Sequence, residues 1–316
     1  MRVVLMATAP FAVPSLQAIA GHKELELALV VTQPDRPSGR GHKIRFTGLK
    51  QAALEAGCTL YQPENVNTRE SLERIRQAEP DVLVVVAYGQ ILNESLLALP
   101  RLGAINLHGS LLPAYRGAAP VHRAVMDGVR TTGVCTMHMV RALDAGDVIH
   151  CTEVPVGPDM TAGDVYDRLA QQGSGLLVRT LLELDRGEAP RTPQNHAEAT
   201  YAPSIRKEEQ RVDWSKDNSA LHNFVRGLQP WPGAITRFRG QPFKILETET
   251  VEDDFGPGEP GTIVQADPRK GLVVRTGHGA LKLVRVKPAG KKAMAARDFL
   301  NGVNISEGEP FDGEEE

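Results

Sequence analysis

Residues 82–87 read Val-Leu-Val-Val-Val-Ala and form the longest aliphatic run of the chain. A run this short cannot span a bilayer, which needs about 20 apolar residues. It is typical of a strand that is buried on both faces of a sheet. Similar runs lie at residues 2–7 and 103–108, with helix-like stretches such as 13–20 between them. This alternation predicts an open, mostly parallel, Rossmann-like α/β sheet.

The same pattern continues over most of the first two thirds of the chain. Residues 133–139 and 148–156 are expected to be strands, and residues 162–186 have the apolar spacing of one long helix. Beyond this helix the sequence becomes polar and rich in proline, which is typical of an interdomain linker. We therefore predict a first domain at residues 1–189 and a linker at residues 190–206.

The remaining residues, 207–316, are built differently. Short strand-like runs follow one another at residues 236–239, 243–249, 261–265, 271–276 and 280–287. The connection Gly277-His278-Gly279 between the last two runs is typical of a hairpin. Short, hairpin-joined strands predict a second domain that is a small OB-like β-barrel. Trp214 and Trp231 are expected to be packing anchors of this domain.

Charge and cysteine content limit the classes of protein to consider. The 316 residues carry 36 Lys and Arg against 39 Asp and Glu, a net charge of −3, which argues against binding to nucleic acid by bulk charge. The cysteines, at positions 58, 135 and 151, are odd in number and contain no CxxC pair. We expect a reducing compartment, the cytoplasm, with no structural zinc and no particular role for the cysteines.

Several common catalytic patterns are absent from the sequence: GxGxxG after the first strand, GxxxxGK[ST], GxSxG and HExxH. The densest polar segment instead follows the predicted strand at 103–108 and contains Asn106 and His108. Because these two residues lie two positions apart on a strand, their side chains project to the same face. They lie at the carboxyl end of the strand, where α/β sheets bind ligands. An amide and an imidazole there suit a reaction that develops negative charge on a carbonyl oxygen. The alternative is a turn that uses both side chains for local hydrogen bonds.

Two other polar segments have open interpretations. Asp144 and Asp147 flank Gly146 in a predicted loop, where they are either functional carboxylates or an ordinary turn. Residues 36–45 place four cations and no acid on a loop rich in proline and glycine. That loop either contacts phosphate groups or is simply solvated.

Motifs in both predicted domains match one family of enzymes. They lie at residues 32–37, 39–41, 84–89, 106–113, 116–120, 143–147, 213–215, 230–232 and 287–294. Through them the chain resembles methionyl-tRNA formyltransferases. The resemblance implies a formyltransferase fold that transfers the formyl group of 10-formyltetrahydrofolate to the α-amine of methionine on initiator methionyl-tRNA, for translation initiation.

The resemblance also implies that residues 1–189 form a catalytic, folate-binding domain and residues 207–316 a tRNA-binding domain, and it implies roles for particular residues. Catalysis is expected from Asn106, His108 and Asp144, without a metal. The folate donor is expected at two loops that follow strands, with the residues Tyr88, Gly89, Gln90, Ile91, Leu92, Ser110, Leu111, Leu112 and Pro113. Methionyl-tRNA is expected to contact basic residues of both domains, namely Arg36, Arg40, Lys43, Arg45, Lys287, Lys291, Lys292 and Arg297. We expect a monomer that does not contact membranes.

Two other kinds of function stay open at this point. Relatives with the same Asn, His and Asp formylate aminosugar nucleotides or glycinamide ribonucleotide, or hydrolyse formylfolate. A non-catalytic RNA-binding protein would also account for the basic loop and the barrel. The complete catalytic set argues against the RNA-binding protein, and the barrel with its lysine-rich segment at 287–297 argues against the small acceptors.

Overall fold

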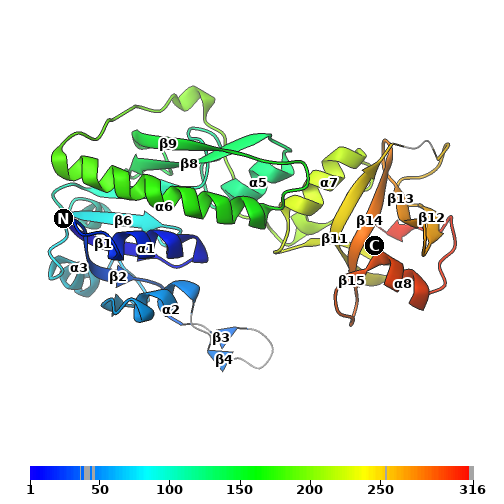
Figure 1. The fold of residues 1–316 in the computed structure, drawn as a ribbon, viewed down its shortest axis with the longest axis horizontal. Helices are drawn as coiled ribbons and strands as arrows, with labels where there is room; N and C mark the ends of the chain where they lie inside the picture. Colours follow the sequence, from blue (N-terminus) through cyan, green and yellow to red (C-terminus); the bar gives the residue numbers. More distant parts are fainter. Residues whose placement is uncertain (36, 39–42, 45–46, 253–254, 313–316) are drawn as a thin grey trace. The chain divides into compact units, whose positions relative to one another are not determined.

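The computed structural model describes residues 1–35, 37–38, 43–44, 47–252 and 255–312, with side chains left out at 37–38, 43–44 and 312 (Figure 1). The chain divides into two compact units. The first unit comprises Met1–Pro120, Thr131–Pro155 and Tyr166–Ala202. The second unit comprises Val121–Arg130, Val156–Val165 and Pro203–Glu316.

The first unit is built on a seven-stranded sheet with the order β5-β2-β1-β6-β7-β8-β9. Its strands are β1 (Arg2–Ala7), β2 (Glu26–Val31), β5 (Leu60–Tyr61), β6 (Val82–Val86), β7 (Ala104–His108), β8 (Thr131–His138) and β9 (Val148–Pro155). In this order the first five strands, β5, β2, β1, β6 and β7, pair in parallel with one another. The strand β8 pairs antiparallel with both β7 and β9. The mostly parallel sheet predicted from the aliphatic runs is confirmed. A separate ribbon pairs β3 (Pro37–Ser38) with β4 (Lys43–Ile44).

Helices pack on both faces of this sheet. They are η1 (Pro10–Ala12), α1 (Val13–Ala20), α2 (Gly48–Glu55), α3 (Arg69–Arg76), α4 (Glu94–Leu97), α6 (Ala162–Arg186), which begins in the second unit, and η2 (His196–Glu198). All five residues of β6 are buried, which explains why its sequence shows no polar alternation. Gly173 of α6 lies against Leu107 and Val134, so α6 covers the face of β7 opposite Asn106 and His108. No helix among the described residues has the length and apolar content to cross a membrane.

The second unit contains an antiparallel sheet with the order β12-β13-β14-β11-β10-β16. Its strands are β10 (Ala234–Phe238), β11 (Gln241–Val251), β12 (Ile263–Asp267), β13 (Gly271–Arg275), β14 (Ala280–Pro288), β15 (Met294–Ala295), which pairs with β14, and β16 (Phe311–Asp312). The two ends of the sheet meet, because the backbone N–H of Phe311 donates to Gly261 and that of Ile263 donates to Glu309. The sheet therefore closes into the predicted small barrel.

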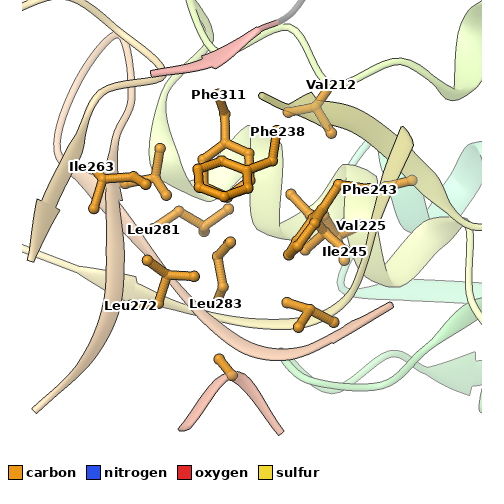
Figure 2. Close-up of a cluster of buried hydrophobic side chains, with 14 of the residues drawn as sticks. Val212, Val225, Phe238, Phe243, Ile245, Ile263, Leu272, Leu281, Leu283 and Phe311 are labelled. Carbon is orange, nitrogen blue, oxygen red and sulfur yellow. The ribbon is translucent and has the colours of Figure 1, made fainter. Parts of the chain in front are cut away.

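Aliphatic side chains and a group of phenylalanine rings fill the interior of this barrel (Figure 2). Phe243 lies 5.2 Å from Phe311 between ring centroids, and Phe238 lies 5.1 Å from Phe311. Trp214 is buried beside Phe311 and is a packing anchor, as predicted. The same prediction is wrong for Trp231, which is 70% exposed because it lies in the turn between α7 and β10, outside the barrel core.

The helices of the second unit are short. They are α5 (Pro120–Met126), which begins at the last residue of a first-unit segment, η3 (Glu208–Gln210), α7 (Asn218–Gly227) and α8 (Ala296–Gly302). The helix α7 is capped at its N-terminus by Asp217, whose side chain accepts a hydrogen bond from the backbone of Ala220. It buries Leu221 and Val225 in the barrel core. Neither α7 nor α8 was predicted from the sequence.

The predicted linker at 190–206 lies partly within the first unit, which extends to Ala202. Thr192 bridges to Val148, and Tyr201 bridges to Arg116. The polar composition of this segment therefore reflects hydrogen bonding to the first unit as well as its place between the predicted domains. The predicted limits of the catalytic and tRNA-binding domains stay a prediction.

Cys135 of β8 and Cys151 of β9 face each other across the hairpin and form a disulfide. The prediction that the cysteines have no structural role is wrong for this pair. Their positions are 16 residues apart, and only the strand register brings them opposite each other. Cys58 is free and half-buried.

Candidate active site

The end of β7 carries the two polar side chains singled out in the sequence. Asn106 pairs with Met137 and His108 pairs with Cys135 in the register of β7 and β8, so both lie on the face that α6 does not cover. His108 is 6% exposed, and its Nε2 lies 3.0 Å from the Tyr115 carbonyl oxygen. Because that oxygen can only accept, Nε2 carries a proton. Nδ1 is therefore the ring nitrogen that remains for chemistry.

Asp144 approaches His108 from the loop between β8 and β9. Its Oδ2 lies 3.7 Å from His108 Nδ1 and accepts a hydrogen bond of 2.8 Å from the backbone N–H of Gly117. The loop is tightly packed: a Cβ added at Gly146 would lie 1.8 Å from the backbone oxygen of His138. The structure thus brings Asp144 to the predicted pair, whereas Asp147 turns away and pairs with Arg191.

The Asp144 loop is also held by a residue that the sequence analysis placed in the linker. Gln194 donates from Nε2 to the carbonyl oxygens of Asp144, at 2.9 Å, and Gly146, at 2.6 Å. Its Oε1 accepts from Arg116. Both Gln194 and Arg116 are buried. A single polar residue in a polar segment gives no sequence signal for such a role, whereas Arg116 lies in one of the recognised motifs.

Asn106 is half-buried, and its amide makes no hydrogen bond with any of the described residues. An amide N–H donor beside an imidazole and a carboxylate suits attack on a carbonyl carbon. The amide would stabilise the developing oxyanion, and the His–Asp pair would handle the proton. The described residues include no group of three His, Cys, Asp or Glu side chains that could hold a metal ion.

The loop at 88–92, predicted to contact folate, joins the ends of three strands. The Tyr88 carbonyl accepts hydrogen bonds from the Thr8 hydroxyl, at 2.9 Å, and the Gln33 amide, at 3.0 Å. The Tyr88 ring is buried in the core, and this burial raises the pKa of its hydroxyl to about 12. Leu92 lies in the same core. Neither the ring of Tyr88 nor the side chain of Leu92 presents a ligand surface.

The middle of this loop differs from its ends. Gln90 bonds to the backbone of Val66 and Glu64 through its amide. Gly89 and Ile91 are exposed, Ile91 by 85%. An added Cβ at Gly89 would lie 2.6 Å from the Gln33 amide nitrogen, so a glycine keeps the backbone accessible here. Exposed backbone beside an apolar side chain is the kind of surface that a flat heterocycle uses.

The second loop predicted to contact folate, 110–113, follows His108 directly. The Ser110 hydroxyl is buried and donates to the Ala114 carbonyl at 2.6 Å, which closes the loop into a turn. The other three residues are half-buried: Leu111, Leu112 and Pro113. Leu111 packs against Gly133, where an added Cβ would lie 2.3 Å from the leucine side chain. Ser110 therefore shapes the loop, and the following residues provide its accessible apolar surface.

The predicted tRNA contacts divide into two groups. Arg36, Arg40 and Arg45 lie outside the described residues, and Lys43 is described only by its backbone, in β4. The second group lies on the second unit and is exposed throughout: Lys287, Lys291, Lys292 and Arg297. Lys287 is on β14, the next two follow in the turn to β15, and Arg297 is on α8, 3.7 Å from Asp298.

Comparisons with known proteins agree with this arrangement. The formyl transferase family matches residues 1–181, and the formyl transferase C-terminal domain matches residues 204–304. The methionyl-tRNA formyltransferase of Moorella thermoacetica is 48% identical over 98% of this chain and 98% of that protein. That of Halothermothrix orenii is 42% identical over 98% and 99%.

A solved structure supports the fold independently. HypX from Aquifex aeolicus, solved in complex with tetrahydrofolic acid, is similar with a TM-score of 0.62 at 17% identity, over 99% of this chain and 50% of that chain. The parallel sheet followed by a barrel, with both family matches, defines the chain as a formyl transferase, an enzyme. Within that class the chain belongs to the methionyl-tRNA formyltransferase family.

Proposed function

We propose that the protein transfers the formyl group of 10-formyltetrahydrofolate to the α-amine of methionine on initiator methionyl-tRNA, with Asn106, His108 and Asp144 as its catalytic residues. The observation that carries this proposal is the approach of Asp144 to His108 at the end of β7, beside the Asn106 amide. The activity belongs to translation initiation, and the cytoplasm is its compartment. The protein is proposed to act as a monomer.

In the reaction, the neutral methionine amine attacks the formyl carbon and the carbonyl electron pair moves to oxygen. The Asn106 amide N–H is placed to stabilise this oxyanion, and His108 adds to this once its Nδ1 has taken a proton from the attacking amine. The bond to N10 of the folate then breaks as the oxyanion collapses. The proton lost by the amine ends on N10, and His108 Nδ1, oriented by Asp144, is the group placed to carry it.

The donor is proposed to bind across the loops at 88–92 and 110–113. The pterin ring would use the backbone near Gly89 and apolar surface from Ile91 and Leu112, while Tyr88, Gln90 and Ser110 hold the two loops in shape. Of the remaining predicted residues, Leu92 supports the first loop from the core, and the half-buried Leu111 and Pro113 add apolar surface to the second loop. Calorimetry with reduced folate measures this binding directly, and a folded protein without affinity for reduced folate would exclude the donor.

An acceptor assay tests the function as a whole. The purified enzyme is incubated with labelled 10-formyltetrahydrofolate and either charged initiator tRNA, an aminosugar nucleotide or glycinamide ribonucleotide. We expect label on methionyl-tRNA alone. Label on a small acceptor, or free formate in the absence of any acceptor, would replace the proposed substrate. Activity after treatment with a chelator tests the expectation that no metal takes part.

The tRNA is proposed to bind through basic residues of both units. Phosphate contacts release counterions, so affinity should fall steeply with salt, and each lost contact should lower the log-log slope by about one. The double variant Lys291→Ala/Lys292→Ala is therefore expected to bind initiator tRNA more weakly and with a smaller slope. Arg269→Ala/Lys270→Ala removes the same charge from another exposed turn of the second unit and is the matched control. Equal affinities and slopes for both variants would exclude the proposed surface.

A further inference from the structure

Asp144 adopts a left-handed backbone conformation, with a φ of 47°. Residues with side chains rarely adopt this conformation, and it persists where surrounding contacts impose it. The bond from Gly117 to the carboxylate restrains the end of the side chain. It does not fix the peptide groups on either side of the turn. Those peptide groups are held by Gln194, whose Nε2 reaches the carbonyl oxygens of both Asp144 and Gly146.

The Gln194 amide can have only one orientation. Arg116 donates to its Oε1 from Nε, at 3.2 Å, and from Nη2, at 2.6 Å. Because a guanidinium only donates, the amide oxygen must face Arg116 and the NH₂ group must face the two carbonyls. Gln194 is 8% exposed and Arg116 is 3% exposed, so water does not compete freely for these bonds. His196 Nδ1, 3.0 Å from Arg116 Nη2, restrains the guanidinium further.

Arg116 also lies between the two residues that contact the catalytic pair. The carbonyl of Tyr115 receives His108 Nε2, and the N–H of Gly117 holds the Asp144 carboxylate. Three consecutive residues therefore contact His108, Gln194 and Asp144 in turn. A change in the Gln194 amide would alter the position of Asp144 relative to His108 without touching either side chain.

We propose that Gln194 is a positioning residue for formyl transfer, acting through the backbone of Asp144. The inference rests on the proposed function. The amide oxygen of Gln194 accepts hydrogen bonds from Arg116. Its NH₂ group holds the turn in the conformation that directs the Asp144 carboxylate toward His108. Gln194 need not touch either substrate, so its effect should appear in turnover and not in donor affinity.

The substitution Gln194→Glu separates the two halves of this amide. A carboxylate, ionised beside Arg116, still accepts both guanidinium bonds but cannot donate to the carbonyls of Asp144 and Gly146. We expect kcat to fall by about ten- to thirtyfold, since small displacements of a catalytic group cost up to about a hundredfold. The KM for 10-formyltetrahydrofolate should stay within about threefold. Gln172→Glu makes the same change at an exposed position of α6 and should leave kcat unchanged.

A double-mutant cycle with Asp144→Ala identifies the residue through which Gln194 acts. In the Asp144→Ala background, Gln194→Glu should change kcat by less than about twofold, because no carboxylate remains to be positioned. The same loss in both backgrounds, or wild-type kcat for the single variant, would overturn the proposal. Melting temperatures distinguish a variant that unfolds from one in which Asp144 is misplaced. Gln194→Met also loses the hydrogen bonds from Arg116 and should therefore be less stable than Gln194→Glu. An inactive wild type would contradict the proposed function itself, not this inference.

Discussion

The proposed catalytic residues come from two regions of the first unit that are built in opposite ways. Asn106 and His108 lie on the regular strand β7, between β6 and β8, where the two-residue repeat and the buried neighbours set their direction. Asp144 lies in a loop, in an unfavourable backbone conformation, and is held by Gly117 and Gln194. The strand places its side chains through local geometry, whereas the loop depends on contacts with distant residues. The loop should therefore be the easier of the two to displace without unfolding the protein.

The largest effect on turnover is expected for a substitution on the strand β7. His108→Ala removes the proposed proton carrier and its contribution to stabilising the oxyanion, and should lower kcat by about two to three orders of magnitude. The Tyr115 carbonyl loses one partner, which should leave the fold intact. Single-turnover formylation of methionyl-tRNA measures the change, with the exposed His278→Ala as control. A folded His108→Ala enzyme with near-normal turnover would remove His108 from the catalytic set.

Reduction of the disulfide is expected to have the next largest effect. It should change the stability of the protein but not the position of Asp144. It closes the hairpin of β8 and β9 that carries the Asp144 loop. For a loop of this length, reduction should lower the free energy of unfolding by about 3 kcal/mol. The reduced enzyme should keep kcat within about threefold, because Gly117 and Gln194 still hold Asp144.

Urea unfolding with and without dithiothreitol measures the first quantity, and turnover in the same buffers measures the second. Alkylation under denaturing conditions without reductant should modify Cys58 alone. Cys58→Ala is the control, since this residue takes no part in the cross-link. A collapse of turnover on reduction would mean that the disulfide, and not the two hydrogen-bonding residues, positions the loop.

The substitution Gly146→Ala should displace the loop that carries Asp144. Its Cβ would lie 1.8 Å from the His138 backbone oxygen, so the loop must move. We expect kcat to fall by roughly thirtyfold, from displacement of Asp144. Gly175→Ala, where an added Cβ meets nothing within 4 Å, should have no effect on turnover. Equal activity of both variants would show that the loop tolerates displacement, contrary to the comparison with the strand.

The smallest effect is expected at a second histidine–carboxylate pair. His150 Nε2 lies 2.5 Å from Glu183 on the face that α6 covers, closer than His108 is to Asp144. Hydrogen bonds from Arg179 and then His150 hold the pKa of Glu183 below its ordinary value of 4.5. A lowered pKa stabilises the fold above pH 4.5, and this contribution is lost as the pH falls through the folded-state pKa.

Glu183→Gln should therefore reduce the free energy of unfolding by at most about 1 kcal/mol at pH 7, as for other partly exposed pairs. The difference from wild type should shrink toward pH 3, and kcat should not change. Urea unfolding at both pH values, with turnover at pH 7, measures these effects. A large loss of kcat would mean that close pairing, and not location at the strand end, marks the catalytic histidine.

The sequence by itself determined the architecture of the two units and the placement of Asn106 and His108 on one strand. The continuous aliphatic run of β6 and the Asn106–His108 spacing on β7 follow from periodicity and burial, which are local properties. The residue patterns also carried the family resemblance. The acceptor contacts of the barrel could be proposed because the lysine-rich segment at 287–297 is visible in the sequence, although the net charge of the whole chain is negative.

Only the tertiary structure decided what holds the loop side together. Gln194 is about fifty residues from the carbonyls it binds, and nothing in a polar, proline-bearing segment distinguishes it from its neighbours. Cys135 and Cys151 become partners only through the register of β8 and β9. Local sequence fixes a side chain's direction on a strand, but a loop's conformation depends on which distant groups satisfy its backbone.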